Sequence, residues 1–388
     1  MGTPVYVYSA ALVRQRFGEL DRAFEGYPHR LHYALKANST LGLARIIHAL
    51  GGGVDANSGG EIEVAIRAGF APADIVLTGV GKTPDEIRLA VGLDISVINA
   101  ESAGELDRID AIARAEGRCA RVALRVNPDI DAESHPHIST GLRTHKFGVP
   151  IRQAVDICRA RAARPGVRLV GLHSHIGSQM VTLDPIRRAT AAIVALADEL
   201  IAGGDRLEHL DLGGGLGISY NGGPVPTARD YVQAIVEPVR PAGLAILLEP
   251  GRWIVGPAGV LIASVVDIKA QDHGKYFVVL DAGMSELMRP ALYGAYHRIH
   301  VLEKRGEDAV CDIVGPLCET SDVFGVDRQL PLPAVGDLVA VLDAGAYGSA
   351  MASNYNRHPL PAEVLVDQRS WRLIRRRQTL ADLLACEQ

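Results

Sequence analysis

The residue most suggestive of chemistry is Lys36, which closes the apolar run LHYALKA. Burying an unpaired ammonium is costly and lowers its pKa, so lysines seldom end a buried strand. A desolvated amine with a pKa near neutrality is what Schiff-base chemistry with a carbonyl cofactor requires. The alternative is a lysine that emerges into a solvated loop, and position alone does not decide between the two.

Two further segments carry groups that suit a phosphorylated planar cofactor. The glycine run DLGGGLG contains Gly214 and Gly215, whose bare backbone amides suit a phosphate, although such runs often form only tight turns. The segment HIGSQ offers His175, a ring able to stack on a planar group, and Ser178, a hydroxyl able to bind a phosphate. A single strand-end histidine is more often structural.

Glu249, in the segment EPGR, follows the apolar run AILL. A carboxylate in such a position needs a cationic partner to stay charged. A protonated pyridine nitrogen would be such a partner, and holding it protonated makes the ring a strong electron sink. The alternative is an internal ion pair with Arg252, which the presence of Lys36 and the glycine run makes less favoured.

The elements that must position these residues alternate between short apolar runs and amphipathic segments. This pattern predicts repeated βα units around a parallel sheet. Eight units favour a closed (βα)8 barrel of the TIM type over residues 12–257, with the polar residues at the carboxyl ends of the strands, where barrel enzymes hold their active sites. The candidate strands begin at Leu31, Gly53, Asp74, Ile95, Arg121, Arg168, His209 and Ala245.

The remaining residues, 1–11 and 258–388, have the period of two that is typical of strands. Runs such as GVLIASVVDIKA and KYFVVLDAG are separated by Gly, Pro and Asp. They predict a mostly antiparallel β domain, a sandwich or barrel-like sheet. We expect the opening PVYVY to pair with this domain rather than to enter the barrel.

Composition and charge exclude several classes of protein. The chain has 388 residues and a formal net charge of −5, with no basic stripe that would indicate a nucleic acid or an anionic membrane as partner. No segment approaches the roughly 20 apolar residues of a membrane span. The five cysteines are far apart and odd in number, which favours a reducing compartment over a disulfide framework or a zinc site. Five histidines at loops or element ends have no spacing that suggests a metal site and are assigned no role: His29, His48, His297, His300 and His358. We therefore expect a cytoplasmic protein with a small-molecule partner and no metal.

Taken together, the motifs resemble the diaminopimelate decarboxylases, a family of pyridoxal-phosphate enzymes of fold type III. The resemblance runs nearly from end to end. HPHISTGLRTHKFG and RPALYGAYH look specific to that family, whereas the lysine, the glycine run and EPGR are shared with ornithine and arginine decarboxylases. The motifs are HYALKAN, VDANSGGE, TGVGKT, LRVNPD, HPHISTGLRTHKFG, GLHSHIGSQ, LDLGGGLGISY, EPGR, DAGM, RPALYGAYH, GPLCETSDV and DAGAYGSAMASNYN.

The resemblance implies pyridoxal 5'-phosphate as cofactor and a role for each matching residue. Lys36 would carry the cofactor, with Asp55 nearby, His175 against the ring and Glu249 facing the pyridine nitrogen. The phosphate would be held by Ser178, Gly214, Gly215 and Tyr347, with Arg252 also on the cofactor. The substrate would be bound by Arg252, Arg289, Tyr293, Glu319 and Tyr347. Two arginines suit a substrate with two carboxylates, because guanidinium and carboxylate pair in a bidentate fork.

Cys318, in GPLCET, matches a cysteine that reaches the site from the partner subunit in similar enzymes and is implicated in protonating the carbanion. The resemblance therefore implies a homodimer with shared active sites. The alternative for Cys318 is a small buried apolar residue, the commoner fate of a free cysteine.

The implied reaction is decarboxylation of meso-2,6-diaminopimelate to L-lysine and carbon dioxide. Two departures from the motifs of the family bear on the preferred substrate. The usual CESGD is CETSD here, with Ser321, and the usual HCHIGS is HSHIGS, with Ser174. The alternatives are a decarboxylase for ornithine, a polyamine precursor or a carrier-tethered amino acid, then a racemase, then a regulator without catalysis. Arg289 argues against short diamino acids, and the complete set of cofactor residues argues against the regulator.

Overall fold

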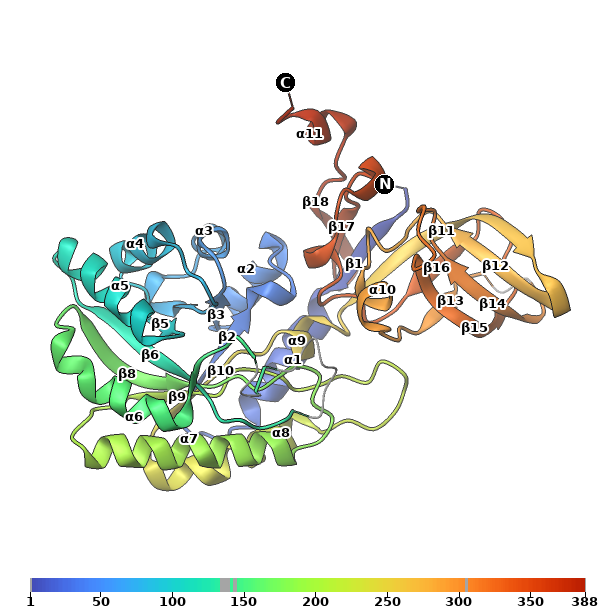
Figure 1. The fold of residues 1–388 in the computed structure, drawn as a ribbon. Helices are drawn as coiled ribbons and strands as arrows, with labels where there is room; N and C mark the ends of the chain where they lie inside the picture. Colours follow the sequence, from blue (N-terminus) through green and yellow to red (C-terminus); the bar gives the residue numbers. More distant parts are fainter. Residues whose placement is uncertain (1, 133–139, 142–144, 304–305, 388) are drawn as a thin grey trace. The chain divides into compact units, whose positions relative to one another are not determined.

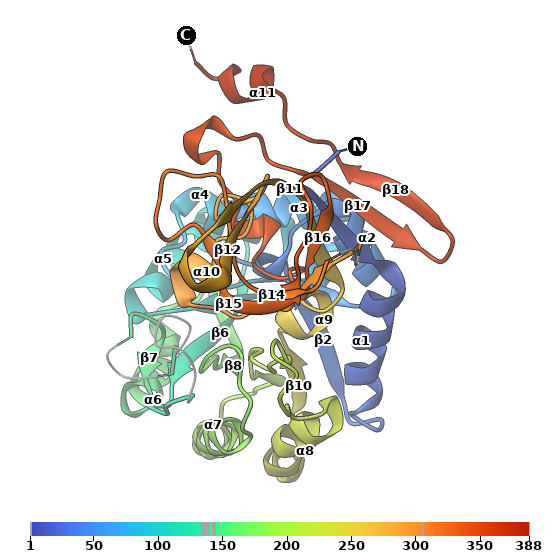
Figure 2. The ribbon, with the colours of Figure 1, turned by 90° about the vertical axis from the view of Figure 1, so that its right-hand side faces the viewer.

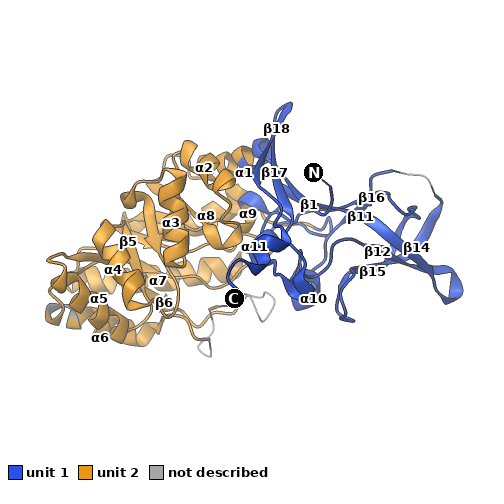
Figure 3. Cartoon of the chain, turned by 90° about the horizontal axis from the view of Figure 1, so that it is seen from above, with its two compact units in different colours: residues 1–13, 218–223, 254–388 blue, residues 14–217, 224–253 orange. Residues whose placement is uncertain are grey.

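The computed structural model describes residues 2–132, 140–141, 145–303 and 306–387. The chain forms two compact units (Figure 3). One contains Met1–Val13, Ile218–Gly223 and Ile254–Gln388, and the other contains Arg14–Gly217 and Pro224–Trp253. Most of the motif HPHISTGLRTHKFG, at 135–139 and 142–144, lies outside the described residues.

The larger unit is a closed barrel of eight parallel strands surrounded by helices, as predicted (Figure 1). The strand order is β5-β4-β3-β2-β10-β9-β8-β6, and pairing of β5 with β6 closes the ring. The strands are β2 (His29–Ala34), β3 (Gly53–Ala56), β4 (Ile75–Leu77), β5 (Val97–Ala100), β6 (Ala120–Asn127), β8 (Val167–His173), β9 (His209–Asp211) and β10 (Ala245–Leu248), with the two-residue β7 (Val149–Pro150) beside β6.

Capping residues fix where helices of the barrel begin and end. Thr83 and Glu86 form a reciprocal capping box at the start of α4, and Gly69 ends α3 in the left-handed conformation. Helices α7 and α8 lie side by side outside the strands (Figure 2). The helices are α1 (Ala10–Arg22), α2 (Leu41–Ala49), α3 (Gly59–Ala68), α4 (Pro84–Leu93), α5 (Ala103–Ala115), α6 (Ile151–Arg159), α7 (Asp184–Ala202), α8 (Ala228–Val239) and α9 (Arg252–Val255).

The interior of the barrel is apolar along part of its length and polar at one end. Val76, Val97, Ala123 and Val170 form a buried apolar cluster contributed by neighbouring strands. The last residues of β8 and β9 and the residue after β10 are instead His173, Asp211 and Glu249, all buried. Because all these strands are parallel, their carboxyl ends meet at one end of the barrel, and the polar groups gather there.

The smaller unit is built on a mostly antiparallel sheet of order β15-β14-β12-β11-β1-β17-β18, in which β16 also pairs with β11 and β13. Strand β1 (Val5–Ser9) pairs antiparallel with β11 and parallel with β17, which confirms the placement predicted for PVYVY. Its alternate residues Tyr6 and Tyr8 are fully buried, as the period of two predicts. The other elements are β11 (Gly259–Ala270), β12 (Lys275–Leu280), α10 (Arg289–Tyr293), β13 (Ile299–Val301), β14 (Asp308–Val314), β15 (Val323–Pro331), β16 (Leu338–Val341), β17 (Ala362–Asp367), β18 (Ser370–Arg375) and α11 (Leu380–Leu384).

Among the helices that the structure describes, none combines the length and the apolar character needed to cross a membrane.

Candidate active site

Lys36 follows β2 directly, in a single turn of 3-10 helix formed by Leu35–Ala37. Its Nζ atom lies 3.2 Å from Oδ2 of Asp55, and its side chain is 31% exposed. The sequence left open whether this amine is buried or emerges into a solvated loop. The short helical turn carries it beyond the strand, where it has both an ion pair and access to solvent. Asp55 is fully buried on β3. Burial and the nearby charge of Glu249 raise the pKa of Asp55 despite the opposing effect of Lys36.

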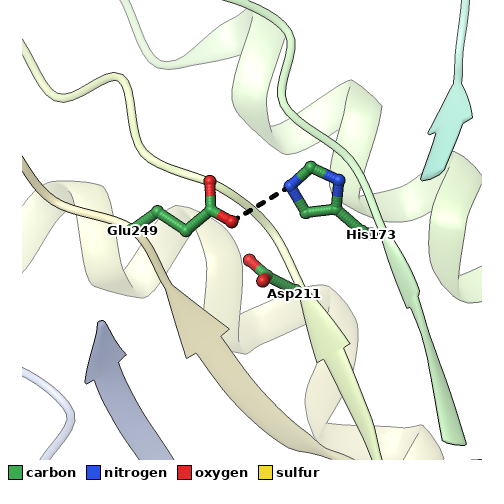
Figure 4. Close-up of side chains that lie close together, drawn as sticks. All are labelled: His173, Asp211 and Glu249. Atoms are coloured by element: carbon green, nitrogen blue, oxygen red, sulfur yellow. Dashed lines mark ion pairs between the residues drawn. The ribbon is translucent and has the colours of Figure 1, made fainter. Parts of the chain in front are cut away.

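Glu249 lies in a polar cluster with His173 and Asp211 (Figure 4). Its Oε1 atom is 3.3 Å from Nε2 of His173 and accepts a hydrogen bond of 3.3 Å from the Thr78 hydroxyl. Oε2 is buried and has no hydrogen-bond partner within the described part of the chain. Arg252, the partner considered from the sequence, instead donates to Oγ of Ser178 at 3.0 Å.

The two carboxyl groups of this cluster have opposite pKa shifts. Burial acts to raise the pKa of Glu249, but His173 and Lys36 outweigh it and hold that pKa well below its usual value. Burial and the negative charge of Glu249 raise the pKa of Asp211 well above its usual value. Glu249 is therefore the ionised member of the pair, and it offers a buried negative charge to a cationic ligand.

His175 follows β8 and contacts the glycine run. The Gly214 amide donates a 3.1 Å hydrogen bond to Nδ1 of His175, so the ring proton is on Nε2. Burial and the charge of Lys36 lower the pKa of His175 well below its usual value, which keeps the ring neutral. A neutral flat ring of this kind suits stacking on another planar group.

The glycine run needs its glycines because other atoms approach its backbone closely. Gly213 and Gly215 have φ values of +64° and +120°. A Cβ atom on Gly214 would meet the carbonyl oxygen of Glu249 at 2.3 Å. The Tyr231 hydroxyl, from α8, donates to the Gly214 carbonyl at 3.0 Å and holds the run from outside.

We expect Gly214→Ala to weaken cofactor binding by about 10-fold or more, because the added methyl group must displace either the glycine run or Glu249. The measurement is the dissociation constant of pyridoxal phosphate for the apoprotein, by fluorescence titration. The control is Gly92→Ala on α4, where an added Cβ would have no neighbour within 4 Å. Equal affinity in both variants would contradict the predicted contact.

These groups together fit pyridoxal phosphate. The amine at the barrel end matches its aldehyde, and the ionised carboxylate matches its ring nitrogen. The neutral imidazole matches the face of its ring, and the close-packed glycine run matches its phosphate. Ser178 adds a hydroxyl that Arg252 already contacts.

The remaining predicted residues belong to the smaller unit. Arg289 is buried at the start of α10, and the half-buried Tyr293 ends that helix. Tyr347 follows β16 with a φ of +57°. Cys318 and Glu319 are exposed in the loop between β14 and β15, so Cys318 is not the buried apolar residue considered as an alternative. Glu319 accepts a 2.7 Å hydrogen bond from the Tyr355 hydroxyl.

The loop that carries Cys318 and Glu319 is organised by Asp322, whose two side-chain oxygens accept hydrogen bonds from the amides of Leu317 at 2.8 Å and Met284 at 2.6 Å. The adjoining Ser321, one of the two departures from the family pattern, is exposed and has its Oγ atom 3.6 Å from the Met284 sulfur. The other, Ser174, is buried with no partner for its hydroxyl in the described structure.

Sequence reasoning did not assign roles to His173, Asp211 and Tyr231. A signal was present for Asp211, because a charged residue in the middle of the apolar run HLDLGG has to be satisfied inside the protein. His173 likewise ends a buried run. Tyr231 offered no such signal, since a tyrosine on the apolar face of a helix usually only packs.

Comparisons with known proteins agree with this site. Residues 10–256 match the family model for the pyridoxal-binding domain of pyridoxal-dependent decarboxylases. Diaminopimelate decarboxylase of Neisseria meningitidis serogroup A is 44% identical over 100% of this chain and 95% of its own. The enzyme of that name from Vibrio cholerae is 44% identical over 100% of this chain and 93% of its own.

A solved structure of Helicobacter pylori diaminopimelate decarboxylase, complexed with L-lysine, has a TM-score of 0.97 and 42% identity, covering 100% of this chain and 97% of that one. The similarity thus extends over both units and over nearly the whole length of the relatives. The chain belongs to the pyridoxal-dependent decarboxylases, with pyridoxal phosphate as cofactor, and within them to the diaminopimelate decarboxylase family.

Proposed function

We propose that this protein decarboxylates meso-2,6-diaminopimelate to L-lysine and carbon dioxide. The observation that carries the proposal is the ionised Glu249, whose buried Oε2 has no hydrogen-bond partner in the described structure, at the barrel end that also carries Lys36. A buried anion of this kind stabilises a protonated ring nitrogen. The similarity to diaminopimelate decarboxylases over the full chain supports the choice of substrate.

When bound, pyridoxal phosphate supplies an electron-withdrawing ring that accepts the electron pair left at the α carbon as carbon dioxide departs. Lys36 holds the cofactor through its Nζ atom, and Asp55 orients that amine by the contact at 3.2 Å. His175 covers the ring face. Ser178, Gly215 and Tyr347 hold the phosphate, with Arg252 supporting Ser178, while the Gly214 amide donates to His175 and so fixes the backbone of the glycine run beside the phosphate. Glu249 keeps the ring nitrogen protonated.

The substrate carries an amino acid at each end, and the proposed binding residues match that chemistry. Arg289 and Arg252 supply guanidinium groups for carboxylates, and Glu319 supplies a carboxylate for an ammonium group. Tyr293 and Tyr347 add hydroxyl donors. Cys318, exposed on its loop, returns a proton to the α carbon of the partner subunit's substrate, with Lys36 as the other candidate for this proton transfer. The five free cysteines favour a reducing, cytoplasmic location.

The first experiment is carbon dioxide release in the presence of pyridoxal phosphate, comparing meso-diaminopimelate with ornithine, arginine and lysine. We expect kcat/KM for meso-diaminopimelate to exceed that for the others by about 10³-fold, because they leave at least one carboxylate-binding group unpaired. A preference for ornithine would favour the related-decarboxylase alternative. Epimerisation without carbon dioxide release would indicate a racemase, and binding of the cofactor without any reaction would indicate a regulator.

The proposed shared active site predicts complementation between two inactive variants. Lys36→Ala and Cys318→Ala each damage one half of a site, so mixed dimers contain one intact site and one doubly damaged site. A 1:1 mixture that exchanges subunits should recover about a quarter of the wild-type activity. Provided that Cys318→Ala is inactive by itself, activity of the mixture that never exceeds the mean of the two separate variants would contradict a site shared between subunits.

A further inference from the structure

Asp211 and Glu249 place two buried carboxyl groups close together at the carboxyl end of the barrel strands. Asp211, on β9, is in register with His173 on β8 and with Leu247 on β10, two residues before Glu249. Residues in register on parallel strands, and residues two apart on one strand, point to the same face, so the three polar side chains converge (Figure 4). Their polar atoms lie within 4.8 Å of one another, and none of the three residues is more than 3% exposed.

Two carboxyl groups in this arrangement hold one proton between them. Burial disfavours the charged form of each group, and repulsion at so short a distance disfavours charging both. The pair therefore consists of one carboxylate and one carboxylic acid, and the acid has an O–H group that can donate a hydrogen bond. The neighbours of each group decide which of the two is the acid.

Glu249 has the neighbours that suit the charged form. Its Oε1 atom lies 3.3 Å from Nε2 of His173 and accepts a hydrogen bond from the Thr78 hydroxyl. The positive charge of Lys36 also acts on this carboxylate. These groups stabilise a negative charge on Glu249.

Asp211 is contacted by neutral donors instead. Its Oδ1 atom accepts a 3.0 Å hydrogen bond from the Gly213 amide, and its Oδ2 atom accepts a weaker one of 3.4 Å from the Asn99 side chain. Oδ2 is thus the oxygen that can carry a proton while the stronger bond at Oδ1 is kept. Burial and the charge of Glu249 raise the pKa of Asp211 well above its usual value, in agreement with this assignment.

We propose that Asp211 is a positioning residue: it holds the one proton of the carboxyl pair and donates it as a hydrogen bond to Glu249, so that a single negative charge, located on Glu249, faces the ring nitrogen of the cofactor. The inference rests on the proposed role of Glu249 toward that nitrogen. The hydrogen bond stabilises the charge of Glu249 and fixes its carboxylate, while neutral Asp211 adds no second negative charge to the barrel. When Glu249 is uncharged, Asp211 releases its proton to solvent and supplies the negative charge in its place.

The test compares the binding of two probes to the apoprotein: pyridoxal phosphate, and its 1-deaza analogue, in which a carbon replaces the ring nitrogen. The ratio of their dissociation constants, analogue over cofactor, isolates the interaction with that nitrogen. We expect a ratio of about 100 in the wild type, as for a hydrogen-bonded pair of charges. Asp211→Ala should lower this ratio about 10-fold, because the donor to Glu249 is lost. Asp211→Asn, whose amide keeps the donor to Glu249 and the acceptor for Gly213, should restore it to within about threefold.

The same substitution should have a different effect when Glu249 carries no charge. In Glu249→Gln, Asp211 ionises, and the ratio should remain at about 10. The double variant Glu249→Gln with Asp211→Asn has no carboxylate in the cluster, so its ratio should fall to about one. Asp198→Asn, at an exposed position of α7, is the matched control for replacing an aspartate with asparagine.

Infrared spectroscopy of the protein with its cofactor supplies a direct readout of the proton. The difference spectrum between the wild type and Asp211→Asn should contain the carbonyl stretching band of an un-ionised carboxyl group. A difference spectrum with carboxylate bands alone would show that Asp211 is ionised and would overturn the proposal.

The other outcomes separate this inference from the proposed function. Equal loss of the affinity ratio in Asp211→Asn and Asp211→Ala, or equal ratios in Glu249→Gln and the double variant, would overturn the role of Asp211. If the wild type does not release carbon dioxide from meso-diaminopimelate, the proposed function fails, and the affinity ratios still decide the role of Asp211. If Asp211→Asn does not fold, Glu249→Gln decides: a ratio of about 10 supports the proposal, and a ratio of about one overturns it.

Discussion

Replacing Lys36 with alanine is expected to reduce carbon dioxide release by roughly 10³-fold or more, because the amine that holds the cofactor is removed. The phosphate contacts remain, so the variant should still bind pyridoxal phosphate, but without a covalent bond. Treatment with borohydride followed by mass spectrometry should find the cofactor on the Lys36 peptide of the wild type and on no peptide of the variant.

The fold should tolerate the loss of Lys36. Asp55 is left without this cation, but burial and the charge of Glu249 already raise its pKa, which allows it to take up a proton instead of remaining a buried charge. The matched control is Lys269→Ala, at a 65% exposed position on β11. Substantial turnover by Lys36→Ala, with the cofactor attached to another lysine, would refute the assignment.

The second large effect is expected for Glu249→Gln, which keeps the shape of the side chain and removes its charge. Without the buried anion the ring nitrogen is no longer held protonated, and kcat should fall by about 10²-fold or more. The visible absorption spectrum of the bound cofactor should change in parallel. Because the charge of Glu249 also raises the pKa of Asp211, that pKa should move back toward its usual value in the variant.

Glu208→Gln is the control for charge removal. Glu208 stands one residue before β9 and pairs with Arg121 at 2.7 Å, with its side chain 46% exposed. Its removal should leave kcat unchanged, since surface ion pairs of this type contribute about 0–1 kcal/mol to stability. A Glu249→Gln enzyme with kcat within threefold of wild type would show that the carboxylate does not govern the ring.

The barrel could be predicted because each of its strands carries a local signal. Strands β8 and β10 lie in mostly apolar runs that lead into polar residues, His173 at the end of β8 and Glu249 after β10, and amphipathic helices separate the strands along the chain. In the smaller sheet β18 lacks such a signal, because it is an outer strand whose residues Trp371 and Leu373 remain exposed. The period of a strand is visible in the sequence only where one face is buried.

The chemical groups at the ends of the strands can be read from the sequence, since residue type and strand position are local properties. Which of these groups interact depends on the tertiary structure. The pairing of Glu249 with His173 depends on β10, β9 and β8 being neighbours, and the contact between Lys36 and Asp55 depends on the pairing of β2 with β3. The contact of His297 Nδ1 with the Leu342 carbonyl oxygen likewise depends on the pairing of β13 with β16. Charge, tautomer and pKa follow from such neighbours, because electrostatic and hydrogen-bond energies depend on distances in space rather than on separation along the chain.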